Sequence, residues 1–375
     1  MNNIVISGTG LYTPLDKITN EELVTSFNQY IKQHNEKHKE EIASGKMSAL
    51  LESTVEFIVK ASGIKNRYVM SKDSILNPQI MAPRIPQRPN DQNSLQCEMS
   101  IAAARQAMAN ANKQASDIDC VIVACSNMER AYPAMAIEVQ NALGIQGYAF
   151  DMNVACSSVT FGMQTAYNAL IANNARAVLM VNPEICSGHL NFKDRDSHFI
   201  FGDICTAAIL ERKETCRVSA PYEILSFKLF TQFSNNIRNN FGFMNRADPE
   251  TMHNPDKLFM QQGRQVFKDI VPLVSRLIVE HLSQNKIEIS QLKRLWLHQA
   301  NINMNHLITQ KILGREASHS EAPIILDEYA NTASAGSLIA FHLYRDDLQA
   351  GDFGIMCSFG AGYSLGNIIL RRVEK

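Results

Sequence analysis

The sequence has no apolar run that approaches the ~18 residues needed to span a bilayer. Its first residues, Met1–Val5, lack a basic region followed by an apolar stretch, so we expect neither a membrane anchor nor a signal peptide. A net charge of −1 over 375 residues provides no basic field to attract nucleic acid or an acidic membrane surface. These absences indicate a cytoplasmic protein with no nucleic-acid or membrane partner.

The sequence also lacks any C-x-x-C pair, although it contains eight cysteines. Closely spaced pairs mark most zinc and dithiol sites, and disulfide frameworks belong mainly to small secreted domains. Here the cysteines are scattered through apolar stretches, so most should be reduced and buried, and we expect no metal and no other cofactor. A hydrophobic content of 45% with 19% charged residues is instead typical of a soluble globular protein with a large core.

Predicted helices and strands alternate along the first half of the chain. Residues 3–13 form an expected strand, residues 20–60 are helical and highly charged, and residues 71–94 form a loop with several prolines. Then follow helix 98–111, strand 120–125, helix 134–143, strand 148–154, a helix from residue 156, and strands 177–181 and 206–210. This alternation predicts an α/β domain whose parallel or mixed sheet is covered by helices. Gly8 and Gly10 form a G-x-G, but without a third glycine the dinucleotide-binding signal is weak.

The second half repeats the order of the first. Its expected strands are 223–229, 294–298, 353–358 and 368–372, and its helices are 258–285, 303–313 and 334–348. Residues 117–124 correspond to residues 291–298, and a strand follows both the Cys156 turn and the Asn331 turn after about 22 residues. The sequence therefore predicts a duplicated βα unit, with halves at 1–215 and 216–375. Equivalent loops of such halves meet, which would bring Cys156 close to the His298 and Asn331 loops.

Cys156 lies in a run of small residues at the start of an expected helix. Unpaired N–H groups and the positive end of the helix dipole should favour the thiolate there, which makes the sulfur a nucleophile for a thioester. Its own N–H could stabilise the resulting oxyanion. A free cysteine is, however, more often a small buried hydrophobe, so the catalytic reading depends on partner groups elsewhere.

Three segments could supply those partners. His298 ends an apolar strand, at the position where active-site groups of α/β proteins collect. Asn331 lies in a turn of small residues, where it could also be an ordinary helix N-cap. The glycine-rich segment 358–366 is either a tight hairpin or a source of a backbone N–H for an oxyanion.

Together these segments resemble the thiolase-fold condensing enzymes, and specifically β-ketoacyl-acyl-carrier-protein synthase III, from the first strand to the last. The matching motifs are the cysteine turn, the H-Q-A-N at 298–301, the N-T at 331–332 and the F-G-x-G at 359–362. Supporting matches lie at residues 63–68, 201–203 and 260–268. The resemblance implies a thiolase-like fold in which duplicated βα halves form a five-layered αβαβα pseudo-dimer.

The resemblance also implies the chemistry. Cys156 would take the acyl group from an acyl-CoA starter, while His298 and Asn331 would bind the thioester carbonyl of malonyl-acyl-carrier protein as it loses carbon dioxide. The product would be a 3-oxoacyl-acyl-carrier protein that initiates fatty acid synthesis. The N–H groups of Cys156 and Ala361 would form the oxyanion hole for acyl transfer. Two neutral donors on one carbonyl stabilise an enolate without a metal.

The family further implies a homodimer, with Tyr132 closing the acyl pocket of the partner subunit. The other acyl-pocket positions would be Val159 and Phe359. Phe57, Asn301 and Lys268 would contact CoA or the acyl carrier protein.

Several positions depart from the family pattern. Phe57 and Ala61 replace a Trp and an Arg that often grip the CoA adenine, Asn303 replaces an Arg, and Val159 replaces a Phe. A smaller side chain at 159 could leave room for a starter longer than acetyl. The segments near 30–50, 71–94 and 234–256 have no assigned role.

Other functions remain open at this point. A thiolase would carry a different histidine turn, elongating synthases pair the cysteine with two histidines, and a papain-like protease would need a C-G-x-C-W context around its cysteine. Related condensing enzymes that use medium-chain acyl-CoA or make secondary metabolites share the fold. A non-catalytic acyl-binding homologue is the alternative from another class, and the complete Cys156, His298 and Asn331 set argues against it.

Overall fold

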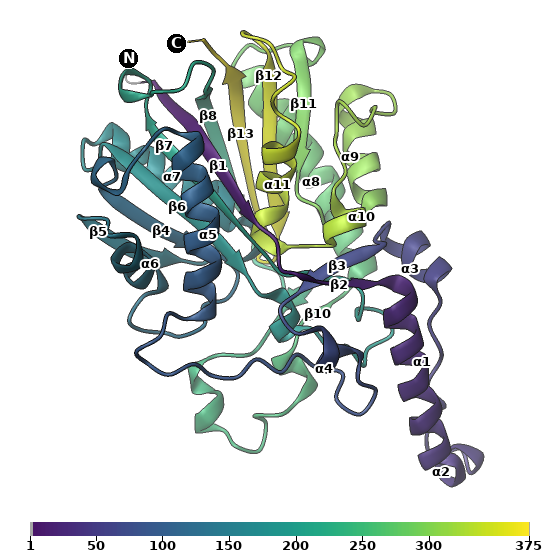
Figure 1. Ribbon diagram of the computed structural model, residues 1–375. Helices are drawn as coiled ribbons and strands as arrows, with labels where there is room; N and C mark the ends of the chain where they lie inside the picture. Colours follow the sequence, from purple (N-terminus) through teal and green to yellow (C-terminus); the bar gives the residue numbers. More distant parts are fainter. Residues whose placement is uncertain (1–2, 375) are drawn as a thin grey trace.

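Nine strands form one continuous mixed sheet in the computed structural model, which describes residues 3–374. The order across the sheet is β11-β12-β13-β8-β1-β7-β6-β4-β5 (Figure 1). The strands are β1 (Ile4–Tyr12), β4 (Cys120–Ala124), β5 (Tyr148–Met152), β6 (Ala177–Glu184), β7 (Ile204–Arg212), β8 (Tyr222–Thr231), β11 (Leu292–Leu297), β12 (Phe353–Gly360) and β13 (Ser364–Arg372).

The sheet consists of two halves with the same pairing pattern. In the first half β4 runs parallel to β6, which is followed by antiparallel β7 and β1; in the second, β11 runs parallel to β12, followed by antiparallel β13 and β8. Within the nine-stranded sheet, the two halves pair with each other where β1 meets β8, through Val5–Glu223 and Ile6–Tyr222. This repeated pattern confirms the duplication predicted from the sequence. The division at residues 215 and 216 stays a prediction.

Helices arrange the two halves into five layers. Helices α5 (Leu95–Asn110) and α6 (Met135–Leu143) cover the outer face of the first half, and α8 (Gly263–Gln284) and α9 (Ile302–Leu313) cover that of the second. Between the halves, α7 (Ser158–Ile171) and α11 (Gly336–Leu343) pack against strands of both. The order helix, sheet, helix, sheet, helix confirms the expected αβαβα fold.

The central strands are buried over their whole length. Every residue of β4, β6 and β7 is buried, as expected for strands covered by helices on both faces, where apolar residues run on without alternation. Strand β5 differs because it lies at the edge of the sheet and pairs with β4 alone. Its residues are partly or fully exposed, so one edge of the sheet is open.

Two helices are shorter in the structure than the sequence predicts. The helix expected from 258 begins at Gly263, because the preceding residues form the ribbon of β9 (Ile237–Arg238) and β10 (Met260–Gln261). The helix expected over 334–348 ends at Leu343. There the carbonyl oxygen of Tyr344 accepts hydrogen bonds from Trp296 and Arg294 instead of continuing the helix.

The charged segment near the N-terminus forms a projecting arm. Helix α1 (Asn20–Lys37) starts with a capping box, in which Thr19 and Glu22 each bond the backbone N–H of the other. Figure 1 shows α1 and the short α2 extending away from the sheet. The other elements of this region are α2 (Lys39–Ala43), α3 (Val55–Ser62), α4 (Lys72–Leu76) and a two-stranded antiparallel sheet of β2 (Asp16–Thr19) with β3 (Asn66–Val69). This small sheet and α4 were not predicted.

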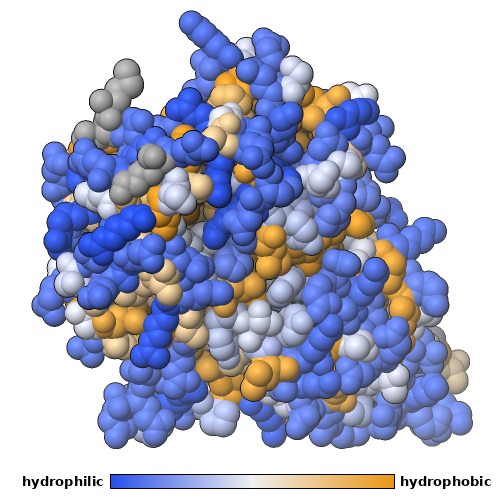
Figure 2. All heavy atoms as spheres, turned by 45° about the horizontal axis from the view of Figure 1, so that its top comes forward, coloured by the Kyte–Doolittle hydropathy of each residue, from blue (hydrophilic) through white to orange (hydrophobic). Residues whose placement is uncertain are grey.

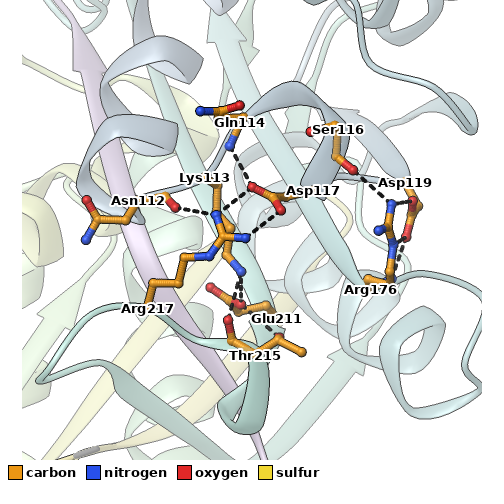
Figure 3. A network of polar contacts seen from close by, with 10 residues as sticks. All are labelled: Asn112, Lys113, Gln114, Ser116, Asp117, Asp119, Arg176, Glu211, Thr215 and Arg217. Atoms are coloured by element: carbon orange, nitrogen blue, oxygen red, sulfur yellow. Dashed lines mark hydrogen bonds and ion pairs between the residues drawn. The ribbon is translucent and has the colours of Figure 1, made fainter.

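A network of charged side chains fixes the connection between the halves (Figure 3). Arg217, which lies between β7 and β8, donates to both carboxylate oxygens of Asp117 at 2.7 and 2.8 Å. Beside it, Lys113 forms a 2.5 Å ion pair with Glu211 of β7, and both side chains are buried. Breaking one side of a buried pair leaves an uncompensated charge, so this network holds the chain in place as it passes from one half to the other.

The surface in Figure 2 is mostly hydrophilic, and apolar side chains appear on it in small separate groups. Such scattered apolar residues are normal on folded proteins. Within residues 3–374, no helix combines the length and the apolar composition that crossing a bilayer requires.

Candidate active site

Cys156 occupies a strained turn directly before a central helix. The residues Ala155–Ser157 form a single 3₁₀ turn, and α7 begins at Ser158, two residues later than expected. Ala155 has φ of 46°, a left-handed conformation that is rare for alanine. The Asn153 side-chain oxygen accepts the N–H of Ala155 at 2.8 Å and stabilises this turn. The turn projects the nucleophile candidate from the end of the helix layer.

Asn331 lies in a second turn of the same construction. Ala333 again has φ of 46°, and the Asn331 side-chain oxygen accepts its N–H at 2.9 Å. The structural counterpart of Asn331 is thus Asn153, and the counterpart of Cys156 is Ser334. The sequence comparison, which set the Cys156 turn against Asn331 itself, was offset by three residues. Because its oxygen is occupied, Asn331 keeps its NH₂ group as a donor.

His298 follows the last residue of β11 and is buried. Its N–H donates to the carbonyl oxygen of Cys357 at 2.8 Å, and its ring meets Phe359 edge to face at 5.2 Å. Within the described residues, the ring Nδ1 has no hydrogen-bond partner. Backbone and aromatic contacts therefore fix the position of the imidazole at the cavity.

Two cavities meet at Cys156. The first, which we call the histidine cavity, has a volume of about 520 Å³ and is lined by Cys156, His298, Asn331 and Phe359, among others. The second, of about 520 Å³, is lined by Cys156, Ala361 and residues 233–235 and 237–241, among others, and we call it the insertion cavity. The fold thus brings together the three predicted catalytic residues in one cavity, with Cys156 shared by both.

The protonation of Cys156 differs from the expectation. Burial raises the pKa of its thiol to about 12, and the negative charge of Glu184 acts in the same direction. The backbone N–H groups of Ala361 and of Cys156 point at the sulfur and act to lower this pKa, but they do not outweigh burial. The helix N-terminus was expected to favour the thiolate; in the structure desolvation is the larger effect, so the resting group is a thiol.

His298 is neutral in the same environment. Burial lowers the pKa of its imidazole to about 4, because the charged ring would lose its hydration there. A neutral imidazole can either accept a proton or donate a hydrogen bond. The imidazole can therefore act on a thioester in the histidine cavity either as a proton acceptor or as a hydrogen-bond donor.

The remaining predicted residues divide into those near the cavities and those away from them. Asn301, Lys268 and Phe359 line the histidine cavity, and Ala361 lines the insertion cavity. Val159 does neither, because it is completely buried in the core between the two half-sheets. Its position therefore does not support the predicted contact with the acyl chain.

Tyr132 lies outside both cavities, with 85% of its surface exposed. The predicted contact of Tyr132 with an acyl chain is therefore not made within one chain.

Asn301 of the H-Q-A-N segment uses its side chain within the protein. Its oxygen caps α9 by accepting the N–H groups of Asn303 and Met304 at 2.9 and 3.2 Å. Its NH₂ group donates to the carbonyl oxygen of Ala61 at 2.6 Å. These bonds join α9 to α3 at the cavity rim, so the residue holds the wall in place rather than offering free polar atoms to a ligand.

Arg195 was missed by the sequence analysis. Its guanidinium carbon lies 4.1 Å from the centre of the Phe57 ring, and its Nε donates to the carbonyl oxygen of Glu52 at 2.8 Å. Phe57 also meets Phe199, which lines the histidine cavity. No local motif marks this arginine, because the contact joins segments about 140 residues apart in the sequence.

Comparison with known proteins identifies the family. The family model for 3-oxoacyl-[acyl-carrier-protein] synthase III matches residues 150–232, which include Cys156. The family model for the C-terminal part of the same enzymes matches residues 282–372, which include His298 and Asn331. A β-ketodecanoyl-[acyl-carrier-protein] synthase of Pseudomonas aeruginosa is 61% identical over 347 residues, 92% of this chain and 99% of that protein. A β-ketoacyl-[acyl-carrier-protein] synthase III of Bartonella henselae is 28% identical over 89% of this chain and 95% of its own.

Solved structures agree on the fold. The 3-oxoacyl-(acyl carrier protein) synthase III of Pseudomonas aeruginosa superposes with a TM-score of 0.76 over 100% of this chain and 99% of its own, at 22% identity. OleA of Xanthomonas campestris, with bound lauric acid and lauroyl-CoA, superposes with a TM-score of 0.74 over 98% and 99% of the two chains, at 16% identity. By sequence and fold, the chain belongs to the 3-oxoacyl-[acyl-carrier-protein] synthase III family of condensing acyltransferases.

Proposed function

We propose that this protein condenses an eight-carbon acyl-CoA with malonyl-acyl-carrier protein and releases CoA and carbon dioxide. One observation carries the proposal: Cys156 lies where two cavities meet, and one of them also holds His298 and Asn331. A nucleophile in that position can hold an acyl chain in one cavity while a second thioester enters the other. The product is a 3-oxoacyl-acyl-carrier protein, which starts a round of fatty acid synthesis.

In the first step, the Cys156 sulfur attacks the thioester carbonyl of the acyl-CoA. The thiol proton passes to His298, the new carbon–sulfur bond forms, and the CoA thiolate leaves and takes the proton. Transfer of this proton in the empty site is uphill, because burial disfavours each charge alone. A thiolate and an imidazolium formed together stabilise each other. The N–H groups of Cys156 and Ala361, which point at the sulfur, are placed to stabilise the carbonyl oxygen.

In the second step, the malonyl thioester binds with its carbonyl oxygen toward His298 and Asn331. The bond to the carboxylate breaks, carbon dioxide leaves, and the electron pair moves into an enolate held by the two donors. The resulting carbon attacks the acyl-enzyme, and Cys156 leaves as the thiolate. Each donor of this kind is typically worth ~3 kcal/mol in the transition state. The proposed chemistry uses side chains and backbone N–H groups of the protein alone, so it needs no metal or prosthetic group.

The starter length is inferred from a relative. The Pseudomonas aeruginosa protein with 61% identity is named for a β-ketodecanoyl product. Since this condensation adds two carbons, a ten-carbon product requires an eight-carbon starter. We place the acyl chain in the insertion cavity, beside Phe233 and Phe241, and the thioester arm of CoA or the carrier protein in the histidine cavity.

The outer end of the histidine cavity has features that suit its proposed ligands. Arg264 and Lys268 are exposed among the residues that line it, and they can pair with phosphates of CoA or with an acidic carrier protein. The stack of Phe57 and Arg195 lies close by and can separate to hold an adenine ring between its members. These features support acyl-CoA and acyl carrier protein as the partners, and we propose that the protein works in the cytoplasm.

We also propose a homodimer built across the open edge at β5. This strand pairs with β4 alone, and an exposed edge readily adds a strand from a second copy. The Asp151 carboxylate of β5 accepts the N–H groups of Met135 and Ala136 at 2.7 and 2.8 Å, which holds the segment of the exposed Tyr132 against this edge. Tyr132 would then reach the acyl chain of the partner subunit. Light scattering should give twice the chain mass of 41.9 kDa.

Intact-mass measurement after mixing with acetyl-, butyryl-, octanoyl- and decanoyl-CoA tests the function. We expect a single acyl adduct that forms fastest with octanoyl-CoA and is absent from Cys156→Ala. Cys97→Ala, which removes a buried thiol of α5, is the matched control and should retain the adduct. Absence of an adduct with every chain length would refute the enzymatic proposal, and fastest reaction with acetyl-CoA would refute the starter assignment.

A further inference from the structure

Glu184 is a buried acid that the proposed mechanism does not use. It is the last residue of β6, a strand that is otherwise apolar apart from Asn182, and its side chain has no exposed surface. Within residues 3–374 no lysine or arginine forms an ion pair with it. Burying a carboxylate without a cation is costly unless several donors satisfy it. The burial of Glu184 without a cation therefore suggests a role that offsets its cost.

Backbone and side-chain donors from two loops surround the carboxylate. The N–H groups of Ser126 and Ser334 donate to Oε1 at 2.9 and 3.2 Å. The Ser126 hydroxyl donates to Oε2 at 2.5 Å, and the Ser334 hydroxyl donates to Oε1. Four donors thus hold the group on both oxygens. The carboxylate joins the loop after β4 to the turn before α11.

That turn is the one that carries Asn331. Ser334 lies three residues after Asn331, in the position that Cys156 occupies in the other half. The Asn331 side-chain oxygen accepts the N–H of Ala333, and this bond orients the Asn331 amide. Ser334 follows Ala333 directly, so its bonds to Glu184 hold this part of the turn in place. A shift of this turn would move the amide away from a bound thioester.

The Cys156 turn packs directly against the Ser334 turn that Glu184 holds, so the charge of this carboxylate acts on nearby thiols. It raises the pKa of Cys156, after burial, and it also raises the pKa values of Cys125 and Cys186. The other acids that act on these neighbours are Asp151, at Cys125, and Asp203, at Cys186. Burial raises the pKa of Glu184 itself to about 7, although the serine donors oppose the change.

We propose that Glu184 is a positioning residue for the condensation step, which fixes the Asn331 turn through Ser334 and holds a negative charge near Cys156. The inference rests on the proposed function. Glu184 would have two separate effects. Its hydrogen bonds support decarboxylation and condensation, whereas its negative charge opposes formation of the Cys156 thiolate before substrate binds. Loss of Glu184 should therefore slow decarboxylation and condensation without slowing acylation of Cys156.

The variant Glu184→Gln tests this. Glutamine has one acceptor oxygen in place of two and no negative charge, so the hydrogen bonds from Ser126 and Ser334 that hold the Asn331 turn become weaker. Malonyl decarboxylation and condensation should fall about tenfold or more. Acylation of Cys156 should not fall. Alkylation of Cys156 by iodoacetamide at pH 8 should become faster, because the thiolate is no longer opposed by the carboxylate.

Two further variants complete the design. Ser334→Ala keeps the charge and removes one donor, so it should slow condensation while leaving the alkylation rate unchanged; it also keeps the test decisive if Glu184→Gln does not fold. Glu211→Gln removes an equally buried carboxylate beside Ala177, at the other end of β6. This control should leave the alkylation rate unchanged.

Wild-type condensation in both Glu184→Gln and Ser334→Ala would overturn the proposal. An equal loss of acylation and condensation, with unchanged alkylation, would do the same, because it indicates general damage. The alkylation rates need no acyl-CoA. Hence a wild-type protein that fails to condense any acyl-CoA refutes the proposed function, while alkylation of the Glu184 variant still tests the charge effect.

Discussion

At the scale of single residues, the room around Cys156 depends on a missing side chain. A Cβ atom added to Gly360 would lie 2.6 Å from the Cβ and 2.9 Å from the Sγ of Cys156. Both distances are well below van der Waals contact. The F-G-x-G segment therefore contributes more than a backbone N–H, because its first glycine lets β12 approach the nucleophile.

We predict that Gly360→Ala slows acylation of Cys156 on the order of 100-fold, since small displacements of a nucleophile have effects of this size. Gly188→Ala is the matched control, because a Cβ there would meet no atom within 4 Å. The acylation rate is measured by intact mass against time. Equal rates for the two variants would contradict this account of the glycine.

The donors on the second thioester lead to another prediction at this scale. Asn331→Ala removes the whole side-chain amide. Its NH₂ group is the proposed donor, and its oxygen accepts the N–H of Ala333 and stabilises the turn. We expect malonyl decarboxylation to fall about 10²- to 10³-fold, the usual cost of losing one such donor. Acylation of Cys156 should remain close to that of the wild type, and release of carbon dioxide from labelled malonyl-acyl-carrier protein measures the difference. Equal loss of both steps would contradict the assigned role.

At the scale of elements, the G-x-G of the first strand has a packing function. A Cβ on Gly8 would lie 2.3 Å from the carbonyl oxygen of Ala107, and one on Gly10 would lie 2.0 Å from that of Ala103. Both carbonyls belong to α5, which covers β1. The pair of glycines lets a helix lie directly on a strand, so the apparent dinucleotide signal is explained by close packing.

From this contact we predict that Gly10→Ala lowers the free energy of unfolding by about 3 kcal/mol, because the added methyl group meets backbone that cannot move aside easily. Urea denaturation followed by circular dichroism measures the change. Gly242→Ala is the control, since a Cβ at Gly242 would contact nothing within 4 Å. A wild-type midpoint for Gly10→Ala would show that α5 can shift at little cost.

The two 3₁₀ turns show how an element can be repeated while its chemistry diverges. Both contain an alanine with φ of 46° and an asparagine that caps it. One turn carries Cys156 at its next position, and the other carries Ser334, bound to Glu184. In the proposed mechanism the first turn uses its cysteine and the second uses its asparagine, so a duplicated backbone would provide both a nucleophile and an amide donor.

At the scale of the whole molecule, buried histidines dominate the response to acid. Burial lowers the pKa to about 4 in His189, His198, His281, His298 and His342. In the unfolded chain histidine titrates near 6.5. Between these values the unfolded state binds protons that the folded state does not, so the stabilisation present above pH 6.5 is lost as the pH falls toward 4.

Two buried acids act in the opposite sense. Burial raises the pKa of Glu184 to about 7 and that of Asp203 to about 6, so the folded state binds their protons first and gains stability as the pH falls. The loss of stability from the five histidines exceeds the gain from the two acids, because more groups are shifted by a similar amount. We therefore predict that the free energy of unfolding decreases from pH 6.5 to pH 4.5, as measured by urea titration at fixed ionic strength. A constant or rising value would mean that the histidines are charged in the folded protein.

The sequence by itself determined the periodic and local features. Continuous apolar runs gave the buried strands, and the repeated order of elements gave the duplication, because burial on both faces removes alternation. Cys156, His298, Asn331 and the glycine turn could be found because each lies in a short motif next to a recognisable strand or helix. The same short range explains the misplaced helix ends at Gly263 and Tyr344, where distant segments capture the backbone groups.

Only the tertiary structure decided what depends on contacts between distant segments. The thiol form of Cys156 follows from desolvation and from the charge of Glu184, neither of which a helix start reveals. The stack of Arg195 on Phe57 and the burial of Val159 depend likewise on packing. Local sequence sets which groups are present and how the backbone near them turns. Burial, electrostatics and the shape of a cavity arise from all the neighbours at once, and these neighbours come from both halves of the chain.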